Sequence, residues 1–158
     1  MTKKEKLPRV VIVGRMNVGK STLFNRLSED VKSLTFDYHG VTRDFISDVV
    51  CWKDTCFELI DTGGISLKKS VDPITEQVRK QALTLIKDAA VVLFMIDAQV
   101  GITDEDRKIA KELHKLDIPI VIVANKIDTK QAREYDSDFQ RLGFKEIVPI
   151  SAQHGIGI

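Results

Sequence analysis

The chain has 158 residues, of which 43% are hydrophobic and 30% are charged, with a formal net charge of +1. A chain of this length fits one compact domain and buries enough surface to fold without disulfides or a structural metal. The balanced charge gives no electrostatic reason to expect that this domain by itself binds nucleic acid or an anionic membrane. No apolar run is long enough to span a bilayer, and the charged N-terminus has no signal-peptide core, so we expect a cytoplasmic protein.

Short apolar segments alternate with amphipathic segments along the chain, which predicts strands separated by helices. The predicted strands cover residues 10–13, 46–52, 56–60, 90–96, 118–124 and 147–150. The predicted helices cover residues 20–28, 73–87, a segment that begins after Thr103 and, in part, 131–142. This alternation is typical of a mostly parallel sheet with helices on both faces. We therefore expect a single α/β domain over residues 1–158.

A glycine-rich turn between the first predicted strand and helix matches the pattern GxxxxGK[ST] over residues 14–21. Gly14 and Gly19 allow the backbone to wrap around phosphate oxygens, and amides at the helix start point at the anion. Lys20, at an expected exposed helix start, is predicted to reach the β- and γ-phosphates, and the Ser21 hydroxyl to ligate Mg²⁺. The residues of this turn predicted to bind a nucleotide are Gly14, Arg15, Met16, Asn17, Val18, Gly19, Lys20, Ser21 and Thr22.

The segment between residues 29 and 44 has no clear period, which in a compact domain is typical of a functional loop. Thr42 lies just before the next predicted strand, where its hydroxyl would ligate Mg²⁺ and sense the γ-phosphate. Thr35 is the alternative in the same segment. We favour Thr42, because the following strand would carry it to the site.

The strands at residues 46–52 and 56–60 are joined by a tight turn at Lys53 and Asp54, which predicts an antiparallel hairpin. A two-residue turn would place Cys51 directly opposite Cys56, close enough for a disulfide. We nevertheless expect free thiols, because the cytoplasm is reducing.

Asp61 ends the second strand of this hairpin and is followed by a glycine-rich loop. An acidic residue at the end of such a strand is predicted to hold Mg²⁺, as in Walker B sites. Gly64 would bring a backbone amide to the γ-phosphate. Where Ras-type enzymes carry a glutamine that orients the attacking water, this sequence has Ile65, which has no polar group for that role.

Asn125, Lys126 and Asp128 follow another apolar strand and form the pattern NKxD. The Asp128 carboxylate would accept hydrogen bonds from guanine N1–H and the 2-amino group, neither of which adenine offers. Asn125 is expected to tie this loop to the phosphate loop, and the Lys126 stem to pack on the base. Ser151 and Ala152, which follow the last predicted strand, would offer a backbone amide to guanine O6.

Other polar residues have simpler interpretations. The run from Asp104 to Asp106 follows the capping residue Thr103 and is expected to be a solvated helix start. His39, His114 and His154 lack the spacing of metal ligands and are expected to be surface residues.

Together these motifs resemble the first GTPase domain of the EngA (Der) family of bacterial double-domain GTPases, within the Era-like branch. The matching segments are residues 14–27, 40–44, 61–65, 123–126 and 151–157, and the resemblance covers essentially the whole chain. Met16 departs from the proline that the family usually has. The resemblance implies a P-loop NTPase with a Ras-like small GTPase fold, a six-stranded sheet in the order 2-3-1-4-5-6, GTP and GDP as ligands, and Mg²⁺ as cofactor.

The resemblance also implies that a bound K⁺ ion compensates for the missing glutamine, with the Asn17 side chain as its ligand. Asn17 as a loop-shaping residue is the alternative interpretation. Lys20, Thr42, Gly64 and Asn17 are then the residues expected to serve GTP hydrolysis. The family acts in assembly of the large ribosomal subunit and carries a second GTPase domain and a KH-like domain. We therefore expect an N-terminal fragment of a longer protein, without the final helix of the fold.

The leading hypothesis is a switch protein that hydrolyses GTP to GDP and phosphate. The alternative is a GTP-sensing interaction module with negligible turnover, which the missing glutamine favours. An ATPase or kinase built on the same phosphate loop is disfavoured by residues 125–128.

Overall fold

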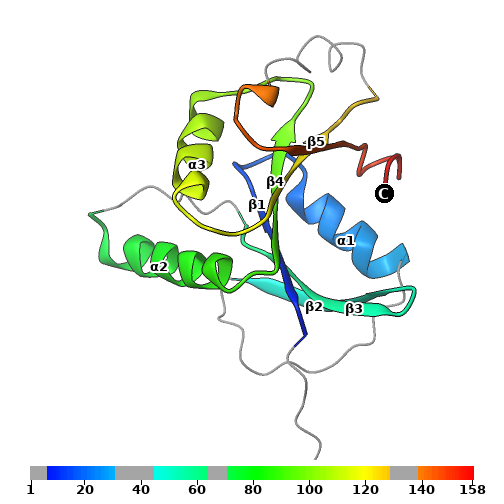
Figure 1. Ribbon diagram of the computed structural model, residues 1–158, viewed down its shortest axis with the longest axis horizontal. Helices are drawn as coiled ribbons and strands as arrows, with labels where there is room; N and C mark the ends of the chain where they lie inside the picture. The colour runs from blue at the N-terminus through cyan, green and yellow to red at the C-terminus, as the bar shows by residue number, and fades with distance from the viewer. Residues whose placement is uncertain (1–6, 31–44, 64–70, 129–138) are drawn as a thin grey trace, which may run out of the picture.

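The computed structural model describes residues 7–30, 45–63, 71–128 and 139–158 of the chain (Figure 1). Its elements are β1 (Arg9–Val13), α1 (Lys20–Asp30), β2 (Ile46–Trp52), β3 (Thr55–Asp61), α2 (Pro73–Lys87), β4 (Val91–Asp97), α3 (Asp104–His114), β5 (Ile120–Asn125) and β6 (Glu146–Pro149). The strands and helices predicted from the sequence in these ranges are confirmed, with ends shifted by one or two residues. The helix predicted over residues 131–142 lies mostly outside the described residues.

The six strands form one sheet in the order β2-β3-β1-β4-β5-β6, as the resemblance implied. β1 is parallel to both of its neighbours, β3 and β4. β5 is likewise parallel to both β4 and β6. The β2–β3 hairpin is antiparallel, as its short turn requires. The prediction of a mostly parallel six-stranded sheet is therefore confirmed.

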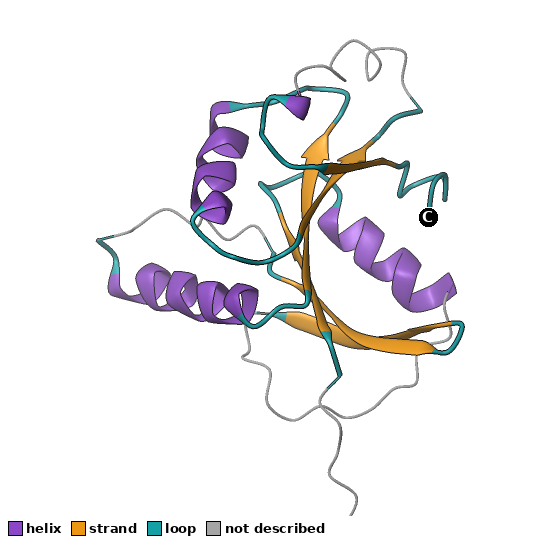
Figure 2. Cartoon of the chain, in the orientation of Figure 1, coloured by secondary structure: helices purple, strands orange, loops and turns teal. Residues whose placement is uncertain are grey.

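Two apolar cores lie on the two faces of the sheet, because successive strand residues point to opposite sides. On β1, Val11 and Val13 pack into the core beneath α2 and α3, whereas Ile12 packs into the core beneath α1. Figure 2 shows the same division, with α2 and α3 on one side of the sheet and α1 on the other. In the part of the chain that the structure describes, no helix is long and apolar enough to cross a membrane.

The functional segments gather at one edge of the sheet. In a parallel sheet all strands end at the same edge, and ligands of open α/β sheets bind outside that edge. The loops after β1, β3, β4 and β5 all begin there. Fold and topology therefore bring together segments that are more than 100 residues apart in the sequence.

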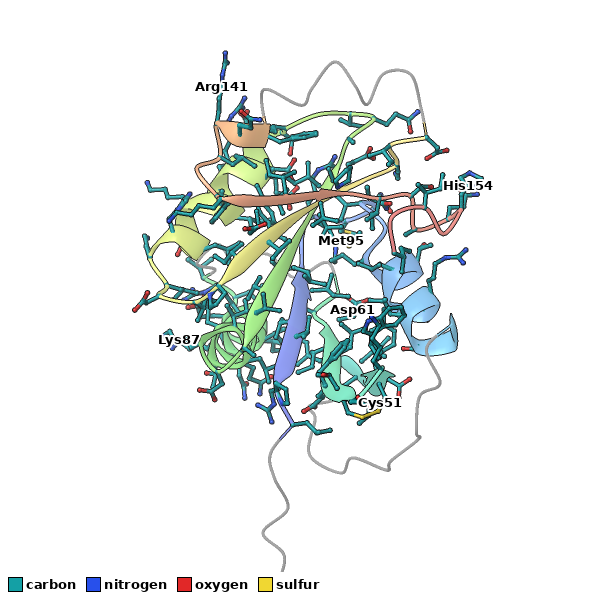
Figure 3. All side chains as sticks on the ribbon, turned by 45° about the vertical axis from the view of Figure 1, so that its right-hand side comes forward. Cys51, Asp61, Lys87, Met95, Arg141 and His154 are labelled. Carbon is teal, nitrogen blue, oxygen red and sulfur yellow. A yellow bond between two sulfur atoms is a disulfide. The ribbon has the colours of Figure 1, made fainter. Side chains whose placement is uncertain are left out.

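The β2–β3 hairpin has the predicted register, with Cys51 opposite Cys56 and Trp52 opposite Thr55. Lys53, the first residue of the turn, has a φ of 53°, which is typical of two-residue hairpin turns. The two Cα atoms of the cysteine pair are 4.0 Å apart and the sulfur atoms are bonded, as Figure 3 shows at Cys51. The expectation of free thiols is therefore wrong for this structure. That expectation was based on the reducing conditions of the cytoplasm. In the structure, the hairpin register places the two cysteines directly opposite each other and their sulfur atoms are bonded.

Candidate nucleotide-binding site

The phosphate loop connects β1 to α1, as its sequence pattern requires. Gly19 has a φ of 103°, and a Cβ atom there would lie 2.3 Å from Nδ2 of Asn125. A Cβ atom at Gly14 would lie 2.8 Å from the carbonyl oxygen of Met95, a residue labelled in Figure 3. Both positions therefore need glycine because other parts of the chain approach the backbone closely.

Lys20 is buried rather than exposed, with 6% of its surface accessible. Its ammonium group donates a hydrogen bond of 2.6 Å to the Arg15 carbonyl oxygen. Burial lowers the pKa of Lys20, and the nearby Asp61 carboxylate opposes that shift. The expectation of an exposed helix start is thus wrong at this position, because the side chain lies against the phosphate loop and donates to one of its carbonyl oxygens. The ammonium group nevertheless lines the cleft described next.

A cleft of about 560 Å³ opens at the carboxyl edge of the sheet, a size typical of small-molecule sites. Its walls come from the phosphate loop, α1, both strands of the hairpin and the loop after β5. The lining residues are Met16, Asn17, Gly19, Lys20, Ser21, Thr22, Ile46, Asp61, Gly63 and Lys126. The cleft therefore brings together several residues predicted to bind phosphate or metal, among them Lys20, Ser21 and Asp61, with Lys126 of the NKxD motif.

The donor atoms in this cleft fit Mg²⁺. Ser21 offers a hydroxyl and Asp61 a carboxylate, and hard oxygen ligands of this kind are what Mg²⁺ prefers. Asp61 is 5% exposed, and one of its oxygens accepts a hydrogen bond of 2.9 Å from the Gly63 amide. The orientation of the carboxylate is thereby fixed. Thr42 and Gly64, the other residues predicted to act at the phosphate, lie outside the described residues.

Asn17 is exposed and has a φ of 68°, a conformation that asparagine tolerates better than most residues. This conformation supports the loop-shaping interpretation. It does not compete with the predicted role as a K⁺ ligand, because Asn17 also lines the cleft. Its neighbour Met16 is 65% exposed, whereas Val18 is fully buried and fixes the loop to the core.

Asn125 ties the NKxD loop to the phosphate loop, as the sequence predicted. Its side-chain amide donates to the Val18 carbonyl oxygen at 2.8 Å, and its side-chain oxygen accepts from the Ala152 amide at 2.9 Å. The Ala152 amide, one of the two backbone amides predicted to donate to guanine O6, is therefore already engaged. The Ser151 amide also has an internal acceptor, the Ile156 carbonyl oxygen at 2.9 Å.

Lys126 lies between the two loops. Its ammonium group donates to the Asn17 carbonyl oxygen at 3.1 Å and pairs with the Asp97 carboxylate at 2.8 Å. Asp97 ends β4 and is 4% exposed, and its other oxygen accepts from the amides of Gln99 and Val100. Asp97 was missed in the sequence, although an acidic residue at the end of an apolar strand is the same signal that identified Asp61.

Asp106 is fully buried, so the expectation of a solvated helix start is wrong at this residue. Its carboxylate accepts from the Thr103 amide at 2.9 Å and lies 3.4 Å from Nε of Arg15 in the phosphate loop. The Thr103 hydroxyl accepts from the Asp106 amide in return, which completes a capping box. The sequence T-x-x-D carried that signal, but nothing in it pointed to Arg15.

Arg26 and His154 are also outside the predicted set. Arg26, on α1, donates to the carbonyl oxygens of Ala152 and Gln153. His154, expected to be a surface residue, is half exposed and lies 3.3 Å from the Asp128 carboxylate.

His114 lies away from this site. The exposed His114 stacks on Phe144 with 4.1 Å between ring centroids. His39 lies outside the described residues. Among the described residues, no group of three histidine, cysteine or acidic side chains could hold a metal ion.

The phosphate loop, the Asp61 carboxylate and the tethered NKxD loop, arranged around one cleft at the carboxyl edge of this sheet, define a P-loop GTPase. Residues 9–126 match the family described as 50S ribosome-binding GTPase. The chain belongs to this family.

Comparison with individual proteins gives the same result. The chain is 46% identical over 151 residues to GTPase Der of Listeria welshimeri, a match that covers 96% of this chain and 34% of the relative. The predicted resemblance to the EngA (Der) family is thus confirmed. The chain spans about a third of the length of these relatives.

Solved structures of Era are also similar. An Era variant from Aquifex aeolicus bound to GDP·AlF₄⁻ superposes with a TM-score of 0.76 at 33% identity, over 96% of this chain and 53% of that one. Era in complex with MgGDPNP and a segment of 16S ribosomal RNA gives the same TM-score, identity and coverage. The Era-like GTPase fold predicted from the sequence is therefore confirmed.

Proposed function

We propose that this chain binds GTP with Mg²⁺ and hydrolyses it to GDP and phosphate. The observation that carries the proposal is the single cleft lined by Lys20, Ser21 and Asp61, with the NKxD loop tied to it through Asn125. Membership of a GTPase family and the MgGDPNP complex of Era support the choice of nucleotide and metal.

The proposed roles follow from the chemistry of each group. The Lys20 ammonium group pairs with the β- and γ-phosphates, and amides of the phosphate loop donate to phosphate oxygens. Ser21 and Asp61 hold Mg²⁺, which neutralises charge that develops on the phosphates in the transition state. Thr42 and Gly64, which lie outside the described residues, are proposed to complete the γ-phosphate contacts.

Guanine is proposed to be selected by the Asp128 carboxylate. Adenine offers no donors to that carboxylate, and a site built to hydrogen-bond one base rejects an analogue that lacks the matching donors by a large factor. The ribose and base would lie over Lys126, whose stem leads from the base loop to the cleft.

A K⁺ ion held by Asn17 is proposed to assist hydrolysis in place of the missing glutamine. The exposure of Asn17 and its place in the wall of the cleft support this role. A cation at this position would stabilise the charge that forms between the β- and γ-phosphates.

The test is phosphate release from GTP and from ATP with Mg²⁺, in K⁺ and in Na⁺ buffers of equal ionic strength. We expect release from GTP only, faster in K⁺. Asn17→Gly should remove most of the difference between the two salts while sparing GDP binding, because glycine keeps the positive φ of the loop.

A different experimental result would contradict each part of the proposal. Equal release from ATP would contradict guanine selection, and equal rates in the two salts with saturating GTP would contradict the K⁺ role. Tight GTP binding without phosphate release in either salt would instead support a GTP-sensing module without turnover.

We also propose a role in assembly of the large ribosomal subunit, supported by the family to which the chain belongs. Because the chain spans about a third of its GTPase Der relatives, this role is proposed for a protein that contains this domain. Correspondence to the first of two GTPase domains and a cytoplasmic location also stay predictions.

A further inference from the structure

His154 contacts the residue that is proposed to recognise guanine. Its Nε2 atom lies 3.3 Å from Oδ2 of Asp128, and the two side chains are 53% and 33% exposed. In the described ranges of the chain, the Asp128 carboxylate has no other hydrogen bond or ion pair. The contact therefore acts on the proposed base acceptor itself.

The loop that carries His154 is held in one conformation. The backbones of Ser151 and Ile156 exchange two hydrogen bonds, of 2.9 and 3.1 Å, which close the loop at its base. Gly155 has a φ of 71°, and a Cβ atom there would lie 3.1 Å from the Arg26 guanidinium. Arg26 in turn donates to two carbonyl oxygens of this loop. The backbone of His154 is thus fixed by the loop closure and by α1.

The same loop is joined to the segment that carries Asp128. The Ala152 amide donates to the Asn125 side chain at 2.9 Å, and the Ile127 amide donates to the Ile150 carbonyl oxygen at 3.2 Å. Both bonds are made by residues of the NKxD segment that precede Asp128. They hold the loop that carries His154 beside the segment that carries Asp128, so the fold brings the two side chains together.

We propose that His154 is a positioning residue for guanine recognition, which orients the Asp128 carboxylate toward the N1–H and 2-amino groups of the base. This inference rests on the proposed function. A carboxylate offers about four acceptor positions, so an imidazole nitrogen 3.3 Å from Oδ2 leaves room for both donors of guanine. Because the carboxylate is oriented before the base arrives, less side-chain freedom is lost on binding.

The consequence is specificity for the 2-amino group. Inosine nucleotides keep N1–H and O6 but lack the 2-amino group, so the preference for GDP over IDP measures how well Asp128 is placed to accept from it. Loss of the orienting contact should reduce this preference more than it reduces affinity for the phosphates.

The experiment measures Kd for GDP and IDP with Mg²⁺ by calorimetry, at the same pH for every variant. His154→Leu removes the donor, and His154→Gln places an amide donor near the position of Nε2. Gln153→Ala changes the neighbouring exposed residue and serves as the matched control.

We expect His154→Leu to weaken GDP binding about five- to tenfold and IDP binding by less, so that the GDP preference falls by about threefold or more. His154→Gln should restore most of the preference, and Gln153→Ala should leave it unchanged. An unchanged preference in His154→Leu, or equal losses for GDP and IDP without rescue by glutamine, would overturn the inference. Failure of the unmodified chain to bind GDP would instead contradict the proposed function.

Discussion

Lys20 is a buried residue that is also proposed to bind the phosphates. Its ammonium group is desolvated, which lowers its pKa, and it is held by the Arg15 carbonyl oxygen and the field of Asp61. A buried cation with few partners gains strongly from a phosphate anion, because charge-assisted hydrogen bonds are stronger where water is excluded. The cleft is therefore preorganised for an anion before one binds.

Replacement of Lys20 by methionine should abolish this advantage while it keeps most of the buried volume. We expect GTP affinity to fall by about 100-fold or more, since a lost hydrogen bond to a charged group costs roughly 1.5–3 kcal/mol and Lys20 is proposed to contact two phosphates. Stability should change little, because removing a desolvated charge offsets the lost hydrogen bond to Arg15. Nucleotide titration and thermal unfolding measure the two effects.

Lys108→Met is the matched control, because Lys108 lies on the exposed surface of α3. It should change neither property. A Lys20→Met chain that melts normally and binds GTP with unchanged affinity would contradict the phosphate site.

The N-terminal turn of α3 contacts the phosphate loop through the Arg15–Asp106 pair. Asp106 completes the capping box of this helix with the N-cap Thr103 and also pairs with Arg15, whose side chain is only 16% exposed. Removal of one partner from a buried ion pair leaves an uncompensated charge, which is more costly than the pair itself. The helix start and the phosphate loop should therefore be coupled in stability.

Asp106→Asn tests this coupling, because asparagine can still accept from the Thr103 amide but carries no charge. We expect the free energy of unfolding to fall by about 2–4 kcal/mol, measured by urea denaturation. Addition of Arg15→Met should then cost much less than it does alone. Strictly additive effects of the two substitutions would show that the pair is not coupled.

Asp104→Asn is the control on the same helical turn. Asp104 pairs with Arg107, and the two side chains are 90% and 62% exposed. Exposed ion pairs contribute little, so this substitution should change stability by less than about 0.5 kcal/mol.

Most elements of the fold could be predicted from the sequence because their signals are local. Alternating apolar segments, a proline at the start of α2 and the cap at Thr103 each determine structure within a few residues. The three nucleotide motifs are local as well, since each needs its own turn at the end of one strand. The strand order depends on contacts between distant segments, so no local pattern predicts it. It could be predicted only from the resemblance to a known family.

The missed residues have contacts that no local pattern contains. Arg15 and Asp106 are 91 residues apart, and Arg26 reaches the carbonyl oxygen of a residue 126 positions away. Arginine on an amphipathic helix is normally solvated, and a histidine in a glycine-rich loop is normally a surface residue. Only the folded arrangement shows that the Arg15–Asp106 pair supports the phosphate loop and that Arg26 and His154 contact the base-reading segments.

The disulfide acts on the stability of the whole molecule rather than on the cleft. It joins Cys51 to Cys56 at the turn of the β2–β3 hairpin, whereas Asp61 ends β3 at the opposite end of that strand (Figure 3). A cross-link stabilises mainly by restricting the unfolded chain, and a loop this short gives roughly 2 kcal/mol or less.

Reduction of the disulfide should therefore lower the urea midpoint modestly and leave GDP affinity unchanged. The double variant Cys51→Ser, Cys56→Ser should have the lower midpoint with or without reductant. Coinciding unfolding curves for the oxidised and reduced chains would contradict a stabilising cross-link.

Gly19 and Asn125 approach each other so closely that the effects of substitutions at the two positions are coupled. A side chain larger than glycine at position 19 displaces the Asn125 amide, and a residue without that amide at position 125 releases the base loop from Val18. A single substitution at either position therefore disturbs the contact between the phosphate loop and the base loop. A chimera that imports the phosphate loop of a different P-loop protein should accordingly retain guanine selectivity only if the segment after β5 is transferred with it.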